Sequence, residues 1–265
     1  QQQGVGWYSG TANAVYQNRD LLHEARPAYV LVLGGDHIYK MNYGVLLAEH
    51  VARGADLSVA CIEVPLEDAC GLGVMSVDAE QRIVGFEEKP ARPTPLPGNR
   101  GRALVSMGIY AFNAAFLHEQ LERDAADPHS SHDFGKDIIP ALLSSARVFA
   151  HRFEHSCVNM VGDRPYWRDV GTLDAYWEAN MDLTHVVPEL NLSDEAWPML
   201  GRQPHRPQAK FVFDDAGRRG VAVDSLVSDG CIVSGALVRR SILFYNARVG
   251  EGSTVEDSVV LPGVQ

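Results

Sequence analysis

A repeated spacing of bulky apolar residues constrains the fold of this chain most strongly. These side chains recur every six residues and, after one step of five, every six again, at Leu226, Ile232, Val238, Phe244, Val249, Val255 and Leu261. One such residue in every six, among Ser, Gly and Val, is typical of a left-handed parallel β-helix, whose triangular coils bury one side chain at each corner. Short strands with coincidental spacing are the alternative. The spacing predicts little more than two coils within residues 221–265.

The sequence before residue 188 shows a different pattern, in which helical and strand segments alternate. Thr11 is expected to cap a helix that extends to about Ala25, and Asn42 a second helix that Gly54 ends. Later helices are expected at 114–123 and 173–183, and strands at 29–33, 57–62, 71–77, 82–87 and 106–112. This order predicts a doubly wound, Rossmann-like α/β domain over residues 1–187.

A proline-rich stretch separates the two patterns. Residues from Pro188 to Pro207 are irregular, and we expect a linker over 188–220 between the α/β domain and the β-helix. The chain begins at Gln1 rather than Met, and the hexads stop at Gln265 without a capping segment. We therefore expect a fragment that lacks both ends.

A continuous apolar run at residues 29–33 leads through two glycines into Asp36. Such a run predicts a strand buried on both faces, as in parallel sheets. Asp36 would then lie at the carboxyl end of a strand, where α/β sheets bind ligands and a carboxylate can hold a hard divalent cation against phosphates. Taken alone, this ending is more often a simple loop start.

The charge balance limits the partners. With 23 basic and 34 acidic residues the net charge is -11, and the pI is about 5.3. This is a poor background for binding nucleic acid or an anionic membrane. An anionic substrate would need particular basic side chains or a metal ion.

Cysteine usage and hydropathy indicate a compartment. The four cysteines form no close pair, which favours a reducing environment for a chain of 265 residues. No apolar run approaches the roughly 18 residues of a membrane span, and no secretory leader opens the sequence. We expect a cytoplasmic protein.

Four stretches together carry a resemblance. In order they are Trp7-Tyr8-Ser9-Gly10-Thr11-Ala12-Asn13-Ala14-Val15, Gly34-Gly35-Asp36-His37-Ile38-Tyr39, Phe86-Glu87-Glu88-Lys89-Pro90 and Trp167-Arg168-Asp169-Val170-Gly171-Thr172. They resemble the bacterial glucose-1-phosphate adenylyltransferases, also called ADP-glucose pyrophosphorylases. Two further stretches agree, Ser106-Met107-Gly108-Ile109-Tyr110 and Ser130-Ser131-His132-Asp133-Phe134-Gly135-Lys136-Asp137. The resemblance runs in unbroken order from Trp7 to about Leu261.

The resemblance implies a reaction in which a phosphate oxygen of glucose 1-phosphate attacks the α-phosphate of ATP, giving ADP-glucose and pyrophosphate for glycogen synthesis. It implies that Asp36 and Asp169 are catalytic and hold Mg²⁺. Positioning and charge neutralisation do most of the work in such transfers. It also implies an allosterically regulated homotetramer in which the β-helix serves assembly and regulation.

The resemblance further implies which residues bind glucose 1-phosphate. Lys89 would bind the sugar phosphate, and Tyr8, Gly73, Glu88 and Ser106 match other contact positions. A glycine such as Gly73 also lets the backbone approach a ligand closely, although a glycine in a strand more often marks a bulge.

Some residues depart from the pattern or stay outside it. Asn13 stands where the family commonly has Asp, and Ser9 where a larger residue is frequent. The glycine-rich nucleotide loop of the family would precede Trp7, so we do not expect the printed chain to bind ATP well. His37 and His132 show no metal-ligand spacing and are expected to form structural hydrogen bonds. Arg168 is expected to form an ion pair, without a catalytic role.

Two alternatives remain open, and a third is set aside. The same fold serves nucleotidyltransferases for another nucleotide or sugar, such as UTP or mannose 1-phosphate. A regulatory subunit without catalysis is a second reading, but it has no chemical need for Asp36, Lys89 and Asp169 together. A hexapeptide acyltransferase generally needs a basic histidine in its β-helix, and residues 221–265 contain none.

Overall fold

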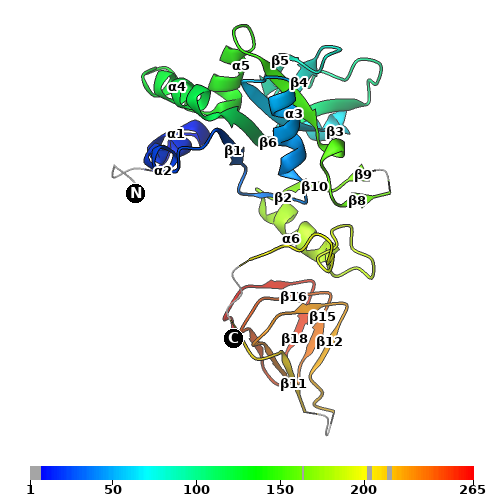
Figure 1. The fold of residues 1–265 in the computed structure, drawn as a ribbon. Coiled ribbons are helices and arrows are strands. Elements are labelled where there is room, and N and C mark those ends of the chain that lie inside the picture. Colours follow the sequence, from blue (N-terminus) through cyan, green and yellow to red (C-terminus); the bar gives the residue numbers. More distant parts are fainter. Residues whose placement is uncertain (1–6, 163, 202–204, 214–216) are drawn as a thin grey trace. The chain divides into compact units, whose positions relative to one another are not determined.

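The computed structural model describes residues 7–162, 164–201, 205–213 and 217–265, which belong to two compact units (Figure 1). Unit 1 comprises Gln1–Gly35 and Met41–Cys157, and unit 2 comprises Asp36–Lys40 and Val158–Gln265. The chain therefore enters unit 2 briefly, directly after the first strand, before it completes unit 1.

A mixed sheet forms the centre of unit 1, in the order β5-β4-β6-β3-β7 with β1 also paired to β6. Only β3 and β7 pair in parallel, and the other pairs are antiparallel. The strands are β1 (Tyr29–Leu33), β3 (Leu57–Pro65), β4 (Gly73–Val77), β5 (Ile83–Glu88), β6 (Arg102–Asn113) and β7 (Val148–Arg152). This α/β sheet confirms the expected fold class, and β4 and β5 form the expected hairpin.

The first strand differs from the prediction. β1 is antiparallel to β6, with Tyr29 opposite Asn113 and Leu33 opposite Ile109. Tyr29 and Leu33 are 40% and 44% exposed, so β1 is not buried on both faces. An apolar run reports burial of its middle residues but not strand direction, and within the described residues β1 has a neighbour on one edge only.

Helices and short helical turns cover the sheet. They are α1 (Thr11–Gln17), α2 (Arg19–Ala25), α3 (Tyr43–Ala52), α4 (Ala114–Ala125) and α5 (Ile139–Leu142), with 3₁₀ turns at Leu66–Gly71 and Phe153–His155 and a π-helix, η2, at Phe134–Ile138. Asn42 caps α3 as expected, because its side chain accepts the Gly44 N–H at 3.0 Å.

The expected cap at Thr11 is wrong. Gly10 is the N-cap of α1, and the Thr11 hydroxyl donates instead to Asp133 Oδ2 at 2.9 Å. The expected single helix is also divided at Asn18, whose side-chain amide donates to the Ala14 carbonyl. A threonine can satisfy its hydroxyl in a tertiary contact, which a local capping rule does not anticipate.

The core of unit 1 lies between the sheet and these helices. Leu117 and Leu121 of α4 and Ala12 of α1 join one buried cluster with strand residues such as Phe112 and with Phe134 of the π-helix. Phe112 and Phe134 are almost fully buried, with ring centroids 5.7 Å apart. Truncating either ring to Ala would cost about 3–5 kcal/mol of folding free energy.

Unit 2 begins with a short antiparallel pair, β2 (His37–Tyr39) and β10 (Trp167–Asp169). It continues with α6 (Leu173–Asp182) and includes a small hairpin of β8 (Met160–Val161) and β9 (Arg164–Pro165). Thr172 caps α6 by accepting the Ala175 N–H at 3.2 Å. The helix therefore begins four residues after Asp169.

The strands from β11 onward form a β-helix, as expected. Its three parallel sheets are β11-β14-β17, β12-β15-β18 and β13-β16-β19, and the orange-to-red strands in Figure 1 stack as successive turns. The strands are β11 (Lys210–Val212), β12 (Val221–Val223), β13 (Leu226–Val227), β14 (Ile232–Ser234), β15 (Leu237–Arg239), β16 (Ile242–Leu243), β17 (Arg248–Val249), β18 (Thr254–Glu256) and β19 (Val259–Val260). β11 lies inside the stretch expected as a linker.

The inward-facing positions agree with the predicted hexads at Val238, Val249 and Val255 and differ from them by one residue at the other four positions. The core of the β-helix includes Val233, Val238, Leu243 and Val249, so Ile232 and Phe244 are each one residue away from the buried position. Leu226 and Leu261 are likewise displaced from the core residues Val227 and Val260. Because strand side chains alternate between the two faces, a single-residue error in register places the side chain outside. Val221 pairs with Leu237 and Leu237 with Thr254, so successive coils are 16 and 17 residues long.

Candidate functional site

Two of the expected catalytic residues meet in unit 2. β2 and β10 pair so that Asp169 lies opposite His37, and the Val170 N–H donates to the Asp36 carbonyl at 2.8 Å. One ligand atom each from Asp36, His37 and Asp169 lies within 4.8 Å of the other two. The structure therefore brings together two carboxylates that are far apart in the sequence.

A glycine keeps the space beside these carboxylates open. A β-carbon on Gly171 would lie 3.1 Å from both Asp169 Oδ1 and Asp36 Oδ2. The Gly171 N–H donates to Asp169 Oδ1 at 2.8 Å, which fixes the orientation of that carboxylate. A larger residue would intrude on the two oxygens.

This donor set fits a divalent cation. The side chains of Asp36 and Asp169 are 59% and 40% exposed, so both carboxylates are accessible to a ligand from solvent. Hard divalent ions such as Mg²⁺ prefer oxygen ligands and retain several waters, and two carboxylates with an open face satisfy both needs. Arg168 forms an ion pair with Asp182, which confirms the ion pair expected for it.

A second group of expected residues lies in unit 1, around Glu88 at the end of β5. Glu88 is the cross-strand partner of Gly73 in β4. Glu88 Oε2 lies 3.0 Å from where a β-carbon on Gly73 would be, and 2.5 Å from where one on Gly135 would be. The carboxylate thus occupies a niche between two glycines.

Burial and a like charge act on Glu88. Burial raises the pKa of the Glu88 carboxyl above its usual range, the negative charge of Asp133 raises it further, and Lys89 opposes the rise. Asp133 is the N-cap of η2, where its Oδ1 accepts the N–H groups of Gly135 and Lys136 at 2.9 and 3.0 Å. Two carboxylates and one ammonium are therefore electrostatically coupled here.

Lys89 occupies a constrained backbone position. Its φ angle is +48°, a left-handed conformation that costs an ordinary residue about 1–2 kcal/mol, and Pro90 follows it. Its N–H donates to the Leu72 carbonyl at 3.1 Å. Glu87 does not engage the lysine but accepts a hydrogen bond from the Thr94 hydroxyl at 3.0 Å. The exposed ammonium is thus attached to a fixed backbone turn.

Ser106 lies on the neighbouring strand β6 and is nearly buried, at 7% exposed. Its hydroxyl accepts the Gly108 N–H at 3.2 Å and hydrogen-bonds with Tyr110. Burial raises the pKa of Tyr110 to about 12, so this phenol remains protonated at neutral pH. The pair supplies neutral hydroxyl groups beside the charged ones.

Tyr8 is half exposed, and its hydroxyl accepts a hydrogen bond from Asn18 at 3.2 Å. The segment that follows it crosses the stretch before η2, where the Ala12 N–H donates to the His132 carbonyl at 2.8 Å. A β-carbon on Gly10 would lie 2.3 Å from that carbonyl oxygen, so only glycine permits this crossing. The stretches 7–15 and 130–137, both of which carry the resemblance, are therefore in contact.

Some residues at these sites were not singled out from the sequence. They are Tyr110, Asp133 and Gly135 in unit 1 and Gly171 in unit 2, and to these the structure adds His37, which was expected to form only structural hydrogen bonds but lies beside the two carboxylates. All five lie within recognised stretches, but only the tertiary contacts show their role. His132 is hydrogen-bonded to Asp124 at 2.9 Å, as its structural interpretation required.

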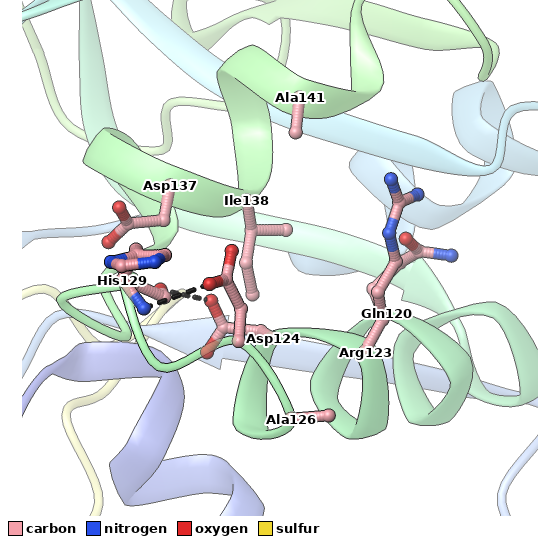
Figure 2. A pocket seen from close by; sticks show the side chains of 10 residues that line it. Gln120, Arg123, Asp124, Ala126, His129, Asp137, Ile138 and Ala141 are labelled. Atoms are coloured by element: carbon pink, nitrogen blue, oxygen red, sulfur yellow. Dashed lines mark hydrogen bonds between the residues drawn. The ribbon is translucent and has the colours of Figure 1, made fainter.

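Unit 1 also contains a polar pocket between α4 and the segment of η2 and α5 (Figure 2). Asp124 accepts the Ser130 hydroxyl at 2.6 Å, and Asp127 accepts the His129 N–H at 2.9 Å. The residues that line this pocket include three carboxylates and one histidine, and Arg123 is the one Lys or Arg among them. The pocket therefore does not suit a phosphate. None of the expected substrate-binding residues lines it.

Comparison with known families places the chain in a class. Residues 1–186 match the family described as nucleotidyl transferase, and residues 207–265 match the family described as GlmU-like, C-terminal hexapeptide. The chain belongs to the nucleotidyl transferase family. Within the part of the chain that the structure describes, no helix has the length and apolar character needed to span a bilayer.

The curated relatives are more specific. The chain is 62% identical over 259 residues to the glucose-1-phosphate adenylyltransferase of Nitrosomonas europaea, covering 97% of this chain and 60% of that protein. It is also 62% identical over 263 residues to that of Paramagnetospirillum magneticum, covering 99% of this chain and 61% of that protein. The same enzyme of Nitrosospira multiformis is 61% identical over 258 residues, with coverage of 97% and 61%. The chain thus spans about three fifths of the length of these relatives.

Proposed function

We propose that the protein to which this chain belongs transfers the adenylyl group of ATP to α-D-glucose 1-phosphate, giving ADP-glucose and pyrophosphate for glycogen biosynthesis. The observation that carries this proposal is the pairing of Asp36 and Asp169 beside Gly171. The names of relatives about 60% identical support the choice of ATP and glucose 1-phosphate.

Asp36 and Asp169 would hold Mg²⁺, which neutralises charge on the nucleotide phosphates. The Gly171 N–H holds the Asp169 carboxylate, and the Val170 N–H holds the backbone of Asp36 by donating to its main-chain carbonyl. This rigidity favours the proposal because in-line transfer between phosphates depends mainly on positioning and electrostatics.

The residues around Glu88 would bind the sugar phosphate. Lys89 would supply a positive charge to the phosphate, and the Glu88 carboxylate would accept hydrogen bonds from glucose hydroxyls. Gly73 and Ser106 would shape the floor of the site, and Tyr8 would contact the substrate from the segment before α1. The small size of Gly73 and Gly135 lets the Glu88 carboxylate lie close against the backbone at both positions, which supports its role as a fixed acceptor.

We also propose that the protein is an allosterically regulated homotetramer in the cytoplasm. The resemblance supports the assembly, and the free state of Cys61, Cys70, Cys157 and Cys231 agrees with a reducing compartment. Light scattering on the full-length protein measures the assembly, and a mass other than four subunits would contradict it.

Pyrophosphate release from the full-length protein tests the substrate choice. The assay compares ATP with UTP, and glucose 1-phosphate with mannose 1-phosphate, in the presence of Mg²⁺. Release with ATP and glucose 1-phosphate alone is expected. Preference for UTP or mannose 1-phosphate would indicate a nucleotidyltransferase of the same fold with another substrate. No release with any pair would favour a regulatory subunit.

A further inference from the structure

We propose that His37 is a third donor of the cation site formed by Asp36 and Asp169, and that it makes this site bind Mn²⁺ more tightly than Mg²⁺. The inference rests on the proposed function, because it assumes that the two carboxylates hold the divalent cation of the transfer reaction. It adds a nitrogen ligand to that site and names the class of cation the site prefers.

The β2–β10 pairing determines where the His37 side chain lies. His37 is the direct cross-strand partner of Asp169, so the two side chains extend on the same face of the ladder. His37 Nε2 lies 3.5 Å from Asp36 Oδ1 and 4.0 Å from Asp169 Oδ2. One ring nitrogen is therefore directed at both carboxylates.

The imidazole is held in this orientation. Its side chain is only 13% exposed, whereas those of Asp36 and Asp169 are 59% and 40% exposed. The ring packs edge-on against Trp167, with centroids 5.3 Å apart. A buried ring supported by an aromatic neighbour loses little further conformational freedom when it binds an ion.

The donor separations suit a small divalent ion. Donors at about 2.1 Å from an octahedral ion are about 3 Å apart when adjacent and about 4.2 Å apart when opposite. The two nitrogen-to-oxygen distances of 3.5 and 4.0 Å lie between these two values, so small side-chain rotations bring the three donors to one ion. Gly171 leaves the adjoining space open, since a β-carbon there would lie 3.1 Å from an oxygen of each carboxylate.

The mixed donor set determines the preferred cation. Mg²⁺ is bound mainly by oxygen ligands and waters, whereas imidazole nitrogen raises the affinity for first-row transition ions relative to Mg²⁺. A site with two carboxylates and one imidazole is therefore expected to favour Mn²⁺, and this preference is expected to weaken when the imidazole is removed.

The test measures metal binding directly in the full-length protein, with Mn²⁺ alone as the probe. The His37→Phe variant removes the nitrogen but keeps a ring against Trp167, and His185→Phe is a matched control at an exposed histidine of the same unit. Free Mn²⁺ is followed by electron paramagnetic resonance, Mg²⁺ by competition, and nitrogen coordination by pulsed resonance of bound Mn²⁺.

We expect nitrogen coupling in the wild type and in His185→Phe but not in His37→Phe. We also expect His37→Phe to weaken Mn²⁺ binding about tenfold or more and Mg²⁺ binding much less. Unchanged Mn²⁺ affinity, or nitrogen coupling that persists in His37→Phe, would overturn the inference. The Asp36→Asn variant distinguishes a failure of the His37 inference from a failure of the proposed function. If this variant retained its Mn²⁺ affinity, the cation site of the proposed function itself would be contradicted.

Discussion

Glu88 and Gly73 face each other across the β4–β5 ladder, and the Glu88 carboxylate lies 3.0 Å from the position of a β-carbon on Gly73. The same β-carbon would lie 2.7 Å from the ring of Phe86, whose side chain belongs to the core. The absence of a side chain at residue 73 therefore allows both the Phe86 ring and the Glu88 carboxylate to occupy their positions.

Replacing Gly73 with Ala is expected to lower the free energy of unfolding by about 1–3 kcal/mol, because the Phe86 ring must move. We also expect the KM for glucose 1-phosphate to rise more than kcat falls. Gly85→Ala on β5 is the control, since its β-carbon would meet Ser76 at an ordinary 3.4 Å. Denaturant unfolding with steady-state kinetics checks both, and equal behaviour of the two variants would contradict the close contact.

Gly171→Ala is expected to impair catalysis without unfolding the protein. The new β-carbon would lie 3.1 Å from an oxygen of Asp36 and of Asp169, so the carboxylates would shift. A misplacement of this kind lowers kcat by about tenfold to a hundredfold. Gly35→Ala is a matched control, since its β-carbon would meet nothing within 4 Å. Full activity of Gly171→Ala would show that the open space is not needed.

Two buried histidines make the stability of unit 1 sensitive to acid. His50 and His151 are each 1% exposed, and burial lowers the pKa of both imidazoles below the ordinary value of 6.5 despite opposing contacts with Asn113 and Glu49. Below about pH 6.5 the unfolded state therefore binds protons that the folded state does not. The contribution of the two neutral imidazoles to the free energy of unfolding is expected to be fully present above this pH and to decline as the pH falls below it.

Thermal unfolding between pH 5 and pH 8 measures this dependence. We expect His151→Gln to reduce the slope below pH 6.5, because it removes one of the two groups that must be protonated on unfolding. The control variant His185→Gln replaces an exposed histidine and is expected to leave the slope unchanged. A melting temperature that is flat or rises toward pH 5 would contradict the assignment.

The register of the β-helix gives a test of its core. Leu243 is fully buried, whereas the adjacent Phe244 was expected from the hexads to point inward but lies outside the core. Leu243→Ala is expected to cost about 2–5 kcal/mol, and Phe244→Ala clearly less. Unfolding of the full-length variants by denaturant distinguishes them, and a larger loss for Phe244→Ala would restore the hexad register.

The sequence predicted the architecture because its periods are strong, but it did not predict every contact. Alternating helical and strand patterns located the elements of unit 1, and the repeat located the β-helix. The inward register held at Val238, Val249 and Val255 but failed at the other four positions, because the core positions from Val227 to Val260 are spaced by five or six residues and only the pleat of each strand decides which of two neighbours is inside.

The site was predicted less completely than the fold. The stretches around Asp36 and Asp169 drew attention to the two carboxylates, but no local pattern shows that β2 and β10 pair and direct His37 toward both. The niche around Glu88 likewise depends on Gly135, which reaches it from η2 in a distant part of the sequence. Local signals identify chemical groups, and tertiary contacts decide which groups act together.

The central claim is that Asp36 and Asp169 support adenylyl transfer by holding a divalent cation. The most direct measurement is pyrophosphate release by the full-length Asp36→Asn variant with ATP, glucose 1-phosphate and Mg²⁺, after its thermal unfolding has been shown to match that of the wild type. The account predicts that the rate falls by about a hundredfold or more, because a metal ligand is lost while the fold is kept. A rate near that of the wild type from the folded variant would contradict it.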